Sequence, residues 1–95
     1  MKIELKKFGT MLVSRQAGRE AYAAFAPSLR EAGRAEPIEV DFSGVITFSP
    51  SWGDEFLRPL AENYGDRLEL LESDNLSVLA SLDILKKTNA VNLER

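Results

Sequence analysis

Hydroxyl and carboxylate side chains gather in one short stretch of the sequence, residues 48–55, which reads Phe-Ser-Pro-Ser-Trp-Gly-Asp-Glu. Ser51 followed by Asp54 or Glu55 could be drawn as a nucleophile with a general base. These residues are neighbours on one turn of an expected helix, and such neighbours do not make a triad with an oriented base. We therefore expect no catalytic residue and no enzymatic activity.

The composition supports the same expectation because the chain contains neither cysteine nor histidine. Without cysteine there is no thiolate nucleophile and no zinc–thiolate site. Without histidine the commonest general base and the commonest metal ligand are both missing. We expect neither a metal site nor a cofactor.

Helix capping explains most of the polar residues in this stretch, in one of two arrangements. Either Ser49 is the N-cap and Pro50 takes the first helical position, or Ser51 is the N-cap and Asp54 closes a capping box. In both arrangements Asp54 and Glu55 lie in the first turn, where the helix dipole favours carboxylates. Capping is the simpler explanation of the serines, although a phosphate would also suit a helix N-terminus.

Trp52, the only tryptophan, has two interpretations that the sequence leaves open. It lies one turn before Phe56, which is typical of a core position, but at a helix start it could also be an exposed binding anchor.

Ser14 and Arg15 mark the start of an earlier helix. Ser14 is expected to be its N-cap. An arginine in the first turn opposes the helix dipole, so we expect Arg15 to pair with a carboxylate. The candidates are Asp41, Asp54 and Glu55.

The elements that must position these residues alternate along the chain. We predict strands over residues 2–7, 38–42 and 67–71, and helices over 15–32 and from 50 or 51 to 63. A third helix begins after Asp74 or Asn75, and the tail from Thr88 to Arg95 is expected to be loosely ordered. Its expected buried residues are Leu76, Leu79, Leu82, Ile84 and Leu85. The order β-α-β-α-β-α predicts an α/β fold with a small, mostly parallel sheet and helices packed on it.

The length of the chain indicates a single domain over residues 1–95. The 12 basic and 15 acidic residues give a net charge of -3, and the basic residues are not clustered. This argues against binding to nucleic acid or to an anionic membrane. No signal peptide or membrane span is evident, so we expect a cytoplasmic protein. The alternating charges of residues 2–7 suggest a protected sheet edge, and a homodimer is possible but unsupported.

The central stretch resembles the STAS domain of anti-sigma-factor antagonists. Residues 41–45, Asp-Phe-Ser-Gly-Val, are similar to the end of the family's buried strand. The following loop leads in that family to Asp-Ser-Ser-Gly at a helix start. Ser49 takes the position of the family's aspartate, Pro50 that of its phosphorylated serine, Ser51 that of the second serine and Trp52 that of the glycine. Because proline has no hydroxyl, phosphorylation at the usual position is impossible here.

The details are more similar to a divergent prokaryotic STAS-like family of unknown function. The similarity includes Leu-Val-Ser-Arg at residues 12–15 and Ser-Trp-Gly-Asp-Glu-Phe at residues 51–56, and it extends over roughly residues 5–79. It implies a STAS-like domain that regulates a kinase-like or anti-sigma-like protein. The implied contact surface is the loop 46–51, including Thr47, and the helix that starts near residue 50.

Two functions are therefore expected from this sequence. The first is a regulatory protein–protein interaction module in which Ser49, Ser51, Trp52, Asp54, Glu55 and Thr47 are the contact or switch candidates, supported by Ser14, Arg15 and Asp41. The second is a small-molecule or nucleotide sensor that uses the same helix N-terminus. The sequence contains no glycine-rich phosphate loop to favour the sensor.

Overall fold

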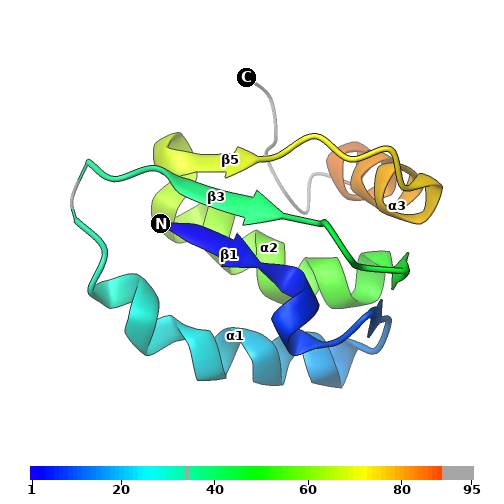
Figure 1. The fold of residues 1–95 in the computed structure, drawn as a ribbon, viewed down its shortest axis with the longest axis horizontal. Coiled ribbons are helices and arrows are strands. Elements are labelled where there is room, and N and C mark those ends of the chain that lie inside the picture. Colours follow the sequence, from blue (N-terminus) through cyan, green and yellow to red (C-terminus); the bar gives the residue numbers. More distant parts are fainter. Residues whose placement is uncertain (34, 89–95) are drawn as a thin grey trace.

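The computed structural model describes residues 1–33 and 35–88, which form an α/β fold (Figure 1). Within these residues, three α-helices, five short strands and two 3₁₀ turns follow one another. In order they are β1 Lys2–Glu4, η1 Leu5–Phe8, β2 Met11–Leu12, α1 Arg15–Arg30, β3 Ile38–Asp41, β4 Thr47–Phe48, α2 Pro50–Tyr64, η2 Gly65–Arg67, β5 Leu68–Leu70 and α3 Leu76–Lys87.

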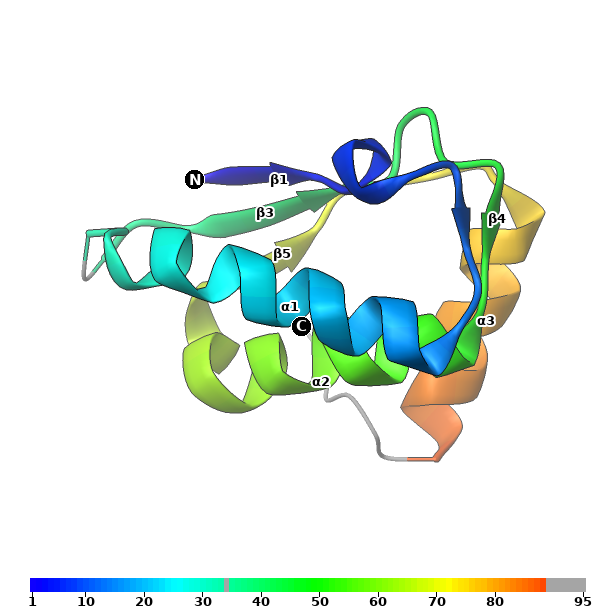
Figure 2. The same cartoon turned by 90° about the horizontal axis from the view of Figure 1, so that it is seen from below.

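The main sheet is parallel and has the strand order β1-β3-β5. Helix α1 connects β1 to β3, and α2 connects β3 to β5. Both helices lie on the same side of the sheet, which leaves α1 and α2 side by side beneath it (Figure 2). The predicted α/β class and element order are confirmed, and β1 is an edge strand as expected.

The core lies between this sheet and the two helices. Ile3, Ile38, Val40 and Leu68 point from the strands into it, and each is at most 4% exposed. From α2 come Trp52, Phe56, Leu57 and Leu60 at helical spacing. Alternation along the strands and a four-residue period along α2 thus produce one shared apolar layer.

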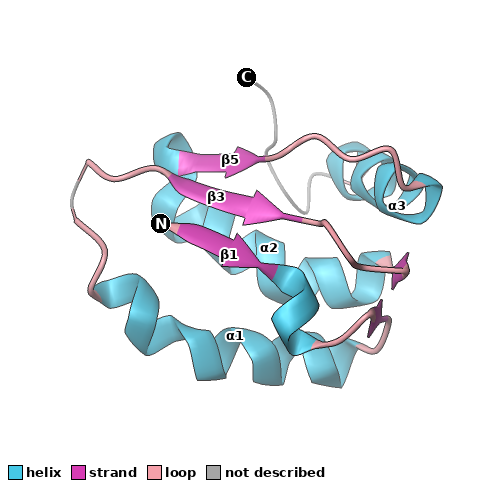
Figure 3. Ribbon diagram, in the orientation of Figure 1, coloured by secondary structure: helices cyan, strands magenta, loops and turns pink. Residues whose placement is uncertain are grey.

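A second sheet of two strands was not predicted. The parallel strands β2 and β4 pair Met11 with Thr47 and Leu12 with Phe48 (Figure 3). Each strand has two residues, too few for an alternating pattern to stand out in the sequence. This small sheet closes one end of the molecule, where β4 leads directly into α2.

Two of the predicted boundaries are wrong. The strand expected over residues 2–7 stops at Glu4, because η1 turns the chain and buries Leu5 completely. The helix expected over residues 15–32 ends at Arg30, and Pro27 lies within it without dividing it. The expectation for the C-terminal tail falls mainly on residues 89–95, outside the described residues.

The predicted buried face of α3 is also wrong in part. Val78, Ser81 and Leu85 are its buried residues, with Leu82 partly buried, whereas Leu76 is 81% exposed. Leu79 and Ile84 are each 47% exposed. Among the described helices, none is both long and apolar enough to cross a lipid bilayer.

Candidate functional site

The loop that follows β3 begins with a turn built on Asp41. One carboxylate oxygen, Oδ1, accepts a hydrogen bond of 2.9 Å from the backbone N–H of Ser43. Gly44 then has a φ of 85°, a left-handed conformation that glycine adopts without strain. The Ser43 N–H lowers the pKa of Asp41, and the nearby Lys2 ammonium adds to this effect. The Asp-Phe-Ser-Gly stretch therefore has a structural role in turning the chain.

Ser49 is the N-cap of α2, which decides between the two arrangements. Its hydroxyl oxygen accepts from the backbone N–H of Trp52 at 3.2 Å and donates to the carbonyl of Val13 at 2.7 Å. Pro50 takes the first helical position. The alternative cap at Ser51 is wrong, because Ser51 lies inside the first turn, half-buried. Among the described residues its hydroxyl has no hydrogen-bond partner.

Trp52 belongs to the core. It is 1% exposed and stacks on Phe56 with ring centroids 4.9 Å apart. Phe48 meets it edge-on at 5.9 Å. The interpretation of Trp52 as an exposed partner-binding anchor is therefore wrong: the first turn of α2 presses the ring beneath the sheet and away from the surface.

Arg15 joins the starts of α1 and α2. Its Nη1 donates to Oδ2 of Asp54 at 2.6 Å and to Oε2 of Glu55 at 2.7 Å. This confirms the expected pairing with two of the three candidate carboxylates, while Asp41 lies instead near Lys2. Ser14 is the N-cap of α1, as predicted, and accepts from the backbone N–H of Ala17.

The ion pairs at this point extend along α2. The hydrogen bonds to Asp54 and Glu55 raise the pKa of Arg15, so the guanidinium keeps its charge. The second oxygen of Asp54, Oδ1, lies 3.1 Å from Nε of Arg58 in an ion pair without hydrogen-bond geometry. Both carboxylates of the motif are thus engaged by arginines within the domain. The expectation that they lie in the first turn is wrong, because the cap at Ser49 starts α2 at Pro50 and places both beyond that turn.

A hollow of about 530 Å³ lies beside Ser51. Arg15, Asp54 and Arg58 line it on the α1 and α2 side, and Ile84 lines it from α3. Of the predicted switch region, Ser51 and Asp54 line this charged hollow, and among the described residues the Ser51 hydroxyl has no hydrogen-bond partner within the domain.

A second hollow, of about 740 Å³, lies at the carboxyl ends of β3 and β5. Its lining includes Glu72 and Asp74, whose charge disfavours an anion. The first N–H groups of α3 are also occupied here, because Asn75 Oδ1 accepts from Ser77 and Val78 at 2.8 and 3.2 Å. This confirms Asn75 as the helix cap and disfavours a nucleotide phosphate at the same place.

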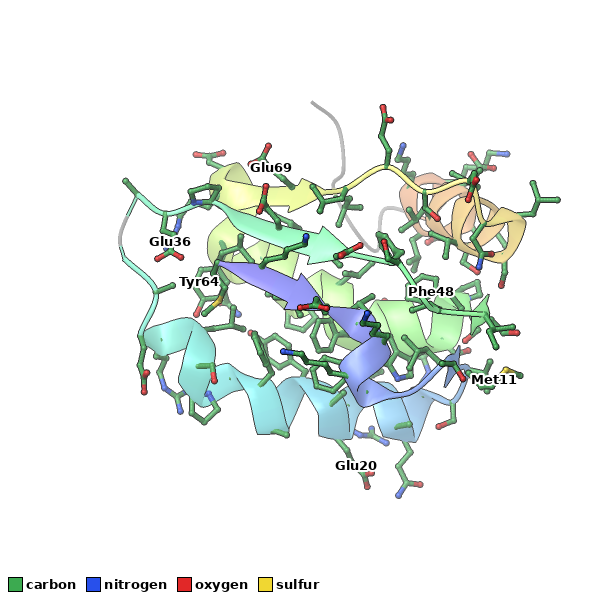
Figure 4. The ribbon with its side chains drawn as sticks, in the orientation of Figure 1. Met11, Glu20, Glu36, Phe48, Tyr64 and Glu69 are labelled. Carbon is green, nitrogen blue, oxygen red and sulfur yellow. The ribbon has the colours of Figure 1, made fainter. Side chains whose placement is uncertain are left out.

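The exposed apolar side chains gather at one end of the molecule. In the described ranges, all six large hydrophobic residues that are exposed come from the chain around β2, from the loop before β4 and from α3. We call them the end patch: Met11, Val13, Ile46, Leu76, Leu79 and Ile84. Figure 4 shows Met11 at this end, beyond Phe48.

Specific contacts tie the end patch to the loop 46–51. The N–H of Ile46 donates to the carbonyl of Thr10 beside Met11. Asn75, the residue before Leu76, donates to the carbonyl of Ile46 at 3.1 Å. Thr47 is half-buried and pairs with Met11 in the two-stranded sheet. The segment 46–51 is therefore not the loop that was expected, because it contains β4 and the start of α2. Exposed apolar side chains that were not predicted flank it at Ile46.

Leu76 was missed because its place in the apolar pattern of α3 suggested burial. The exposure of Met11 and Val13 was missed because a two-residue strand is too short for a sequence pattern that separates its buried face from its exposed face. The one sequence signal for the exposure of Leu76 is the cap at Asn75. A residue directly after an N-cap starts the helix and can point away from the core.

Comparison of the chain with protein-family models, with curated proteins and with solved structures finds no match.

Proposed function

We propose that this domain is a non-enzymatic regulatory module that binds a protein partner through the loop 46–51 and the start of α2. By its resemblance to STAS-like antagonists, the partner is a kinase-like or anti-sigma-like protein, and the setting is signal transduction in the cytoplasm of a prokaryote. The observation that carries the proposal is the end patch.

An apolar patch with a polar rim is the usual form of a protein-binding surface. Met11, Ile46 and Leu76 are 60%, 64% and 81% exposed, and the loop 46–51 joins them. The charged residues beside Ser51 at the rim are of both signs: Arg15, Arg58, Asp54 and Glu62. Burial of the end patch by a partner would supply most of the binding affinity, and the charged residues of the rim would orient the partner.

Ser51 is the proposed switch within this surface. Its hydroxyl is not needed for capping, since Ser49 has that role. A negative charge here would lie beside Asp54 and Glu55 and would change the charge that the partner meets. Pro50 removes the hydroxyl at the neighbouring position, so regulation by a serine in this loop falls to Ser51.

The test compares three forms of the protein: wild type, Ile46→Asp and Ser51→Asp. Each is used to capture partners from the native host, and the partner identified by mass spectrometry is purified for direct measurement of Kd. We expect Ile46→Asp to raise Kd roughly thirtyfold, as for loss of a central apolar contact worth about 2 kcal/mol. Ser51→Asp should also weaken binding, with an unchanged unfolding temperature.

Arg30→Ala is the matched control, because Arg30 is exposed at the opposite end of α1 from Arg15. It should bind the partner like wild type. Equal Kd values for all four forms would reject the proposed surface, and equal Kd values for wild type and Ser51→Asp alone would reject the switch.

The second candidate function is a small-molecule sensor, which the 740 Å³ hollow at the carboxyl ends of the strands favours. Its acidic lining, Glu72 and Asp74, favours a cationic or neutral metabolite over a nucleotide. A thermal-shift screen with metabolites of each charge class tests this function. A rise in unfolding temperature that Asp74→Asn abolishes would support it, and no rise would reject it.

A further inference from the structure

Helix α3 has apolar side chains on both its inner and its outer side. Val78 and Leu85 face the core. Leu76, Leu79 and Ile84 are exposed, whereas in the described chain α1 and α2 expose no large apolar side chain. A helix that is apolar all round is ordinarily buried on every side. Helix α3 instead stands at one end of the molecule, as Figure 2 shows, so its outer side is uncovered in the single chain.

The exposed residues of α3 form a strip with a small residue in its middle. Leu76, Ala80, Asp83 and Lys87 are all exposed, and their spacing places them on one side of the helix. Ala80 allows another helix to approach closely. The carboxylate of Asp83 lies 3.0 Å from Nζ of Lys87, so the charge within the strip is already paired. We call the following residues the outer strip: Leu76, Leu79, Ala80, Asp83, Ile84 and Lys87.

Charges of opposite sign lie at the two ends of the outer strip. Glu72 and Asp74 are exposed just before α3. Lys86 and Lys87 are exposed in its last turn. Leu79 lines the hollow at the strand ends together with Glu72 and Asp74. Lys86 follows Leu79 by two helical turns and shares its side of α3, so the acidic and the basic group lie along the same flank of the strip.

We propose that the outer strip binds the outer strip of a second copy of this chain, with the two α3 helices antiparallel. In a two-fold dimer one patch meets itself, so antiparallel helices bring each end of the strip against the other end of the second copy. Lys86 of each copy then approaches Asp74 of the other. Leu76 approaches Ile84, because both are four residues from Ala80. Parallel helices would instead oppose like charges at both ends.

The size of the outer strip indicates a weak dimer. Helix α3 has 12 residues and is therefore about 18 Å long. One such helix covers less than the roughly 800 Å² per partner that is typical of a stable complex. We therefore expect a Kd on the order of 100 μM. A second copy and a protein partner would compete for the α3 residues of the end patch, whereas Met11 and Val13 lie outside the outer strip.

The test is sedimentation equilibrium of the purified chain over a concentration series, with the variants Lys86→Glu and Asp74→Lys. Each variant alone should raise the dimer Kd roughly tenfold, because the new like-charge contact occurs twice in a symmetric dimer. An equimolar mixture of the two variants should associate like wild type, because opposite charges meet again at both ends of the mixed dimer. Thermal unfolding followed by circular dichroism checks that both variants are folded.

Two matched comparisons accompany these variants. Lys7→Glu makes the same change of charge at an exposed position of η1 and should leave the dimer Kd unchanged. Leu76→Gln and Met11→Gln each remove an exposed apolar side chain from the end patch. Leu76→Gln should raise the dimer Kd roughly tenfold, and Met11→Gln should leave it unchanged.

A wild-type protein that stays monomeric up to its solubility limit would overturn the proposed dimer. So would a mixture of Lys86→Glu and Asp74→Lys that associates no better than either variant alone. Tighter association of Asp74→Lys would show that net charge governs the contact, and equal losses in Leu76→Gln and Met11→Gln would move the contact away from the outer strip. Either result would also overturn it. Because only the purified chain is used, failure here leaves the capture of a partner by the end patch to be judged by its own test.

Discussion

Arg15 shows how one residue can be understood from physical chemistry before the structure is seen. A cation in the first turn of a helix is unfavourable, so a compensating partner had to exist. The structure supplies two, Asp54 and Glu55, which a single nitrogen of Arg15 reaches. The carboxylates that looked like candidate catalytic groups therefore connect two helices.

Replacement of Arg15 by alanine should lower the unfolding midpoint in urea without changing the m-value. The contact between α1 and α2 is lost, and two carboxylates are left beside each other at the start of α2. Chemical denaturation followed by circular dichroism measures the effect. Arg19→Ala, which changes the same residue type on the same helix, should leave the midpoint unchanged, and equal midpoints for both variants would contradict the role assigned to Arg15.

Asp41 should make stability depend on pH in the acid range. In the folded protein the pKa of Asp41 is lowered, mainly by the hydrogen bond from the Ser43 N–H. The ionised carboxylate therefore stabilises the fold fully above the pKa of about 3.9 that an aspartate has in the unfolded chain. This stabilisation is lost as the pH falls through the lower, folded value. Wild type should therefore exceed Asp41→Asn in stability at neutral pH, and the difference should vanish in strong acid. A difference that stays constant over the whole range would refute this account.

At the scale of elements, glycines set how closely the helices approach. A Cβ at Gly53 would lie 2.8 Å from Cδ1 of Leu85 and 2.9 Å from Cζ of Phe48. Gly53 thus lets α2 pack directly against α3 and β4. The Ser-Trp-Gly-Asp-Glu-Phe stretch is explained by packing and ion pairs at every position except Ser51.

Gly53→Ala should destabilise the domain by about 1–3 kcal/mol, as for overpacking of a tight core. Gly65→Ala is the matched control, since nothing lies within 4 Å of its ideal Cβ. The control should be neutral or slightly stabilising. The measurement is the free energy of unfolding from urea titration, and similar values for both variants would show that the helix contact adapts easily.

Helix α3 is attached to β4 through serine hydroxyls. Ser77 Oγ accepts from the N–H of Phe48 and donates to its carbonyl, both at 2.9 Å. Ser81 donates to the same carbonyl at 2.6 Å. The side chain of Ser77 thereby makes the two bonds that a neighbouring strand would make.

Ser77→Ala should cost about 1–3 kcal/mol of stability, because the N–H of Phe48 loses its partner. Ser51→Ala, by contrast, removes a hydroxyl without a partner among the described residues and should stay within about 0.5 kcal/mol of wild type. Thermal unfolding of both variants gives the comparison. A larger loss in Ser51→Ala than in Ser77→Ala would reverse the assignment of roles.

The elements were predicted best where local chemistry dominates. Helix caps depend on neighbouring residues only: the cap at Ser14 is correct, and Asn75 is one of the two caps expected for α3. The buried face of α3 depends on where the helix docks, and β4 is too short to be expected. The helix therefore turns Val78 and Ser81 inward, against the prediction from its leucines.

For the whole molecule, the alternation of strands and helices was enough to predict a small parallel sheet. The candidate site was predicted only in part. The segment 46–51 was expected to be a loop, but Thr47 and Phe48 form β4, and Pro50 and Ser51 begin α2. Trp52 could not be assigned to core or surface from the sequence. The end patch depends on tertiary contacts between β2, β4 and α3, which no local pattern reveals.

The single tryptophan provides a test at this scale. Because Trp52 is 1% exposed, its fluorescence should resist quenching by acrylamide until the whole domain unfolds. Binding of a partner at the end patch should leave the emission maximum unchanged. A shift on binding, with the domain still folded, would restore Trp52 as a contact residue.

The attachment of α3 by hydroxyl groups also has a consequence for aggregation. If α3 detaches, the backbone of β4 becomes an open strand edge, and the apolar side chains around it are already at the surface. Open edges next to apolar surface are the usual starting points of intermolecular β-pairing. We therefore expect heat-induced aggregates of this domain to form first through the chain segment around β4, and Ser77→Ala to aggregate at a lower temperature than wild type.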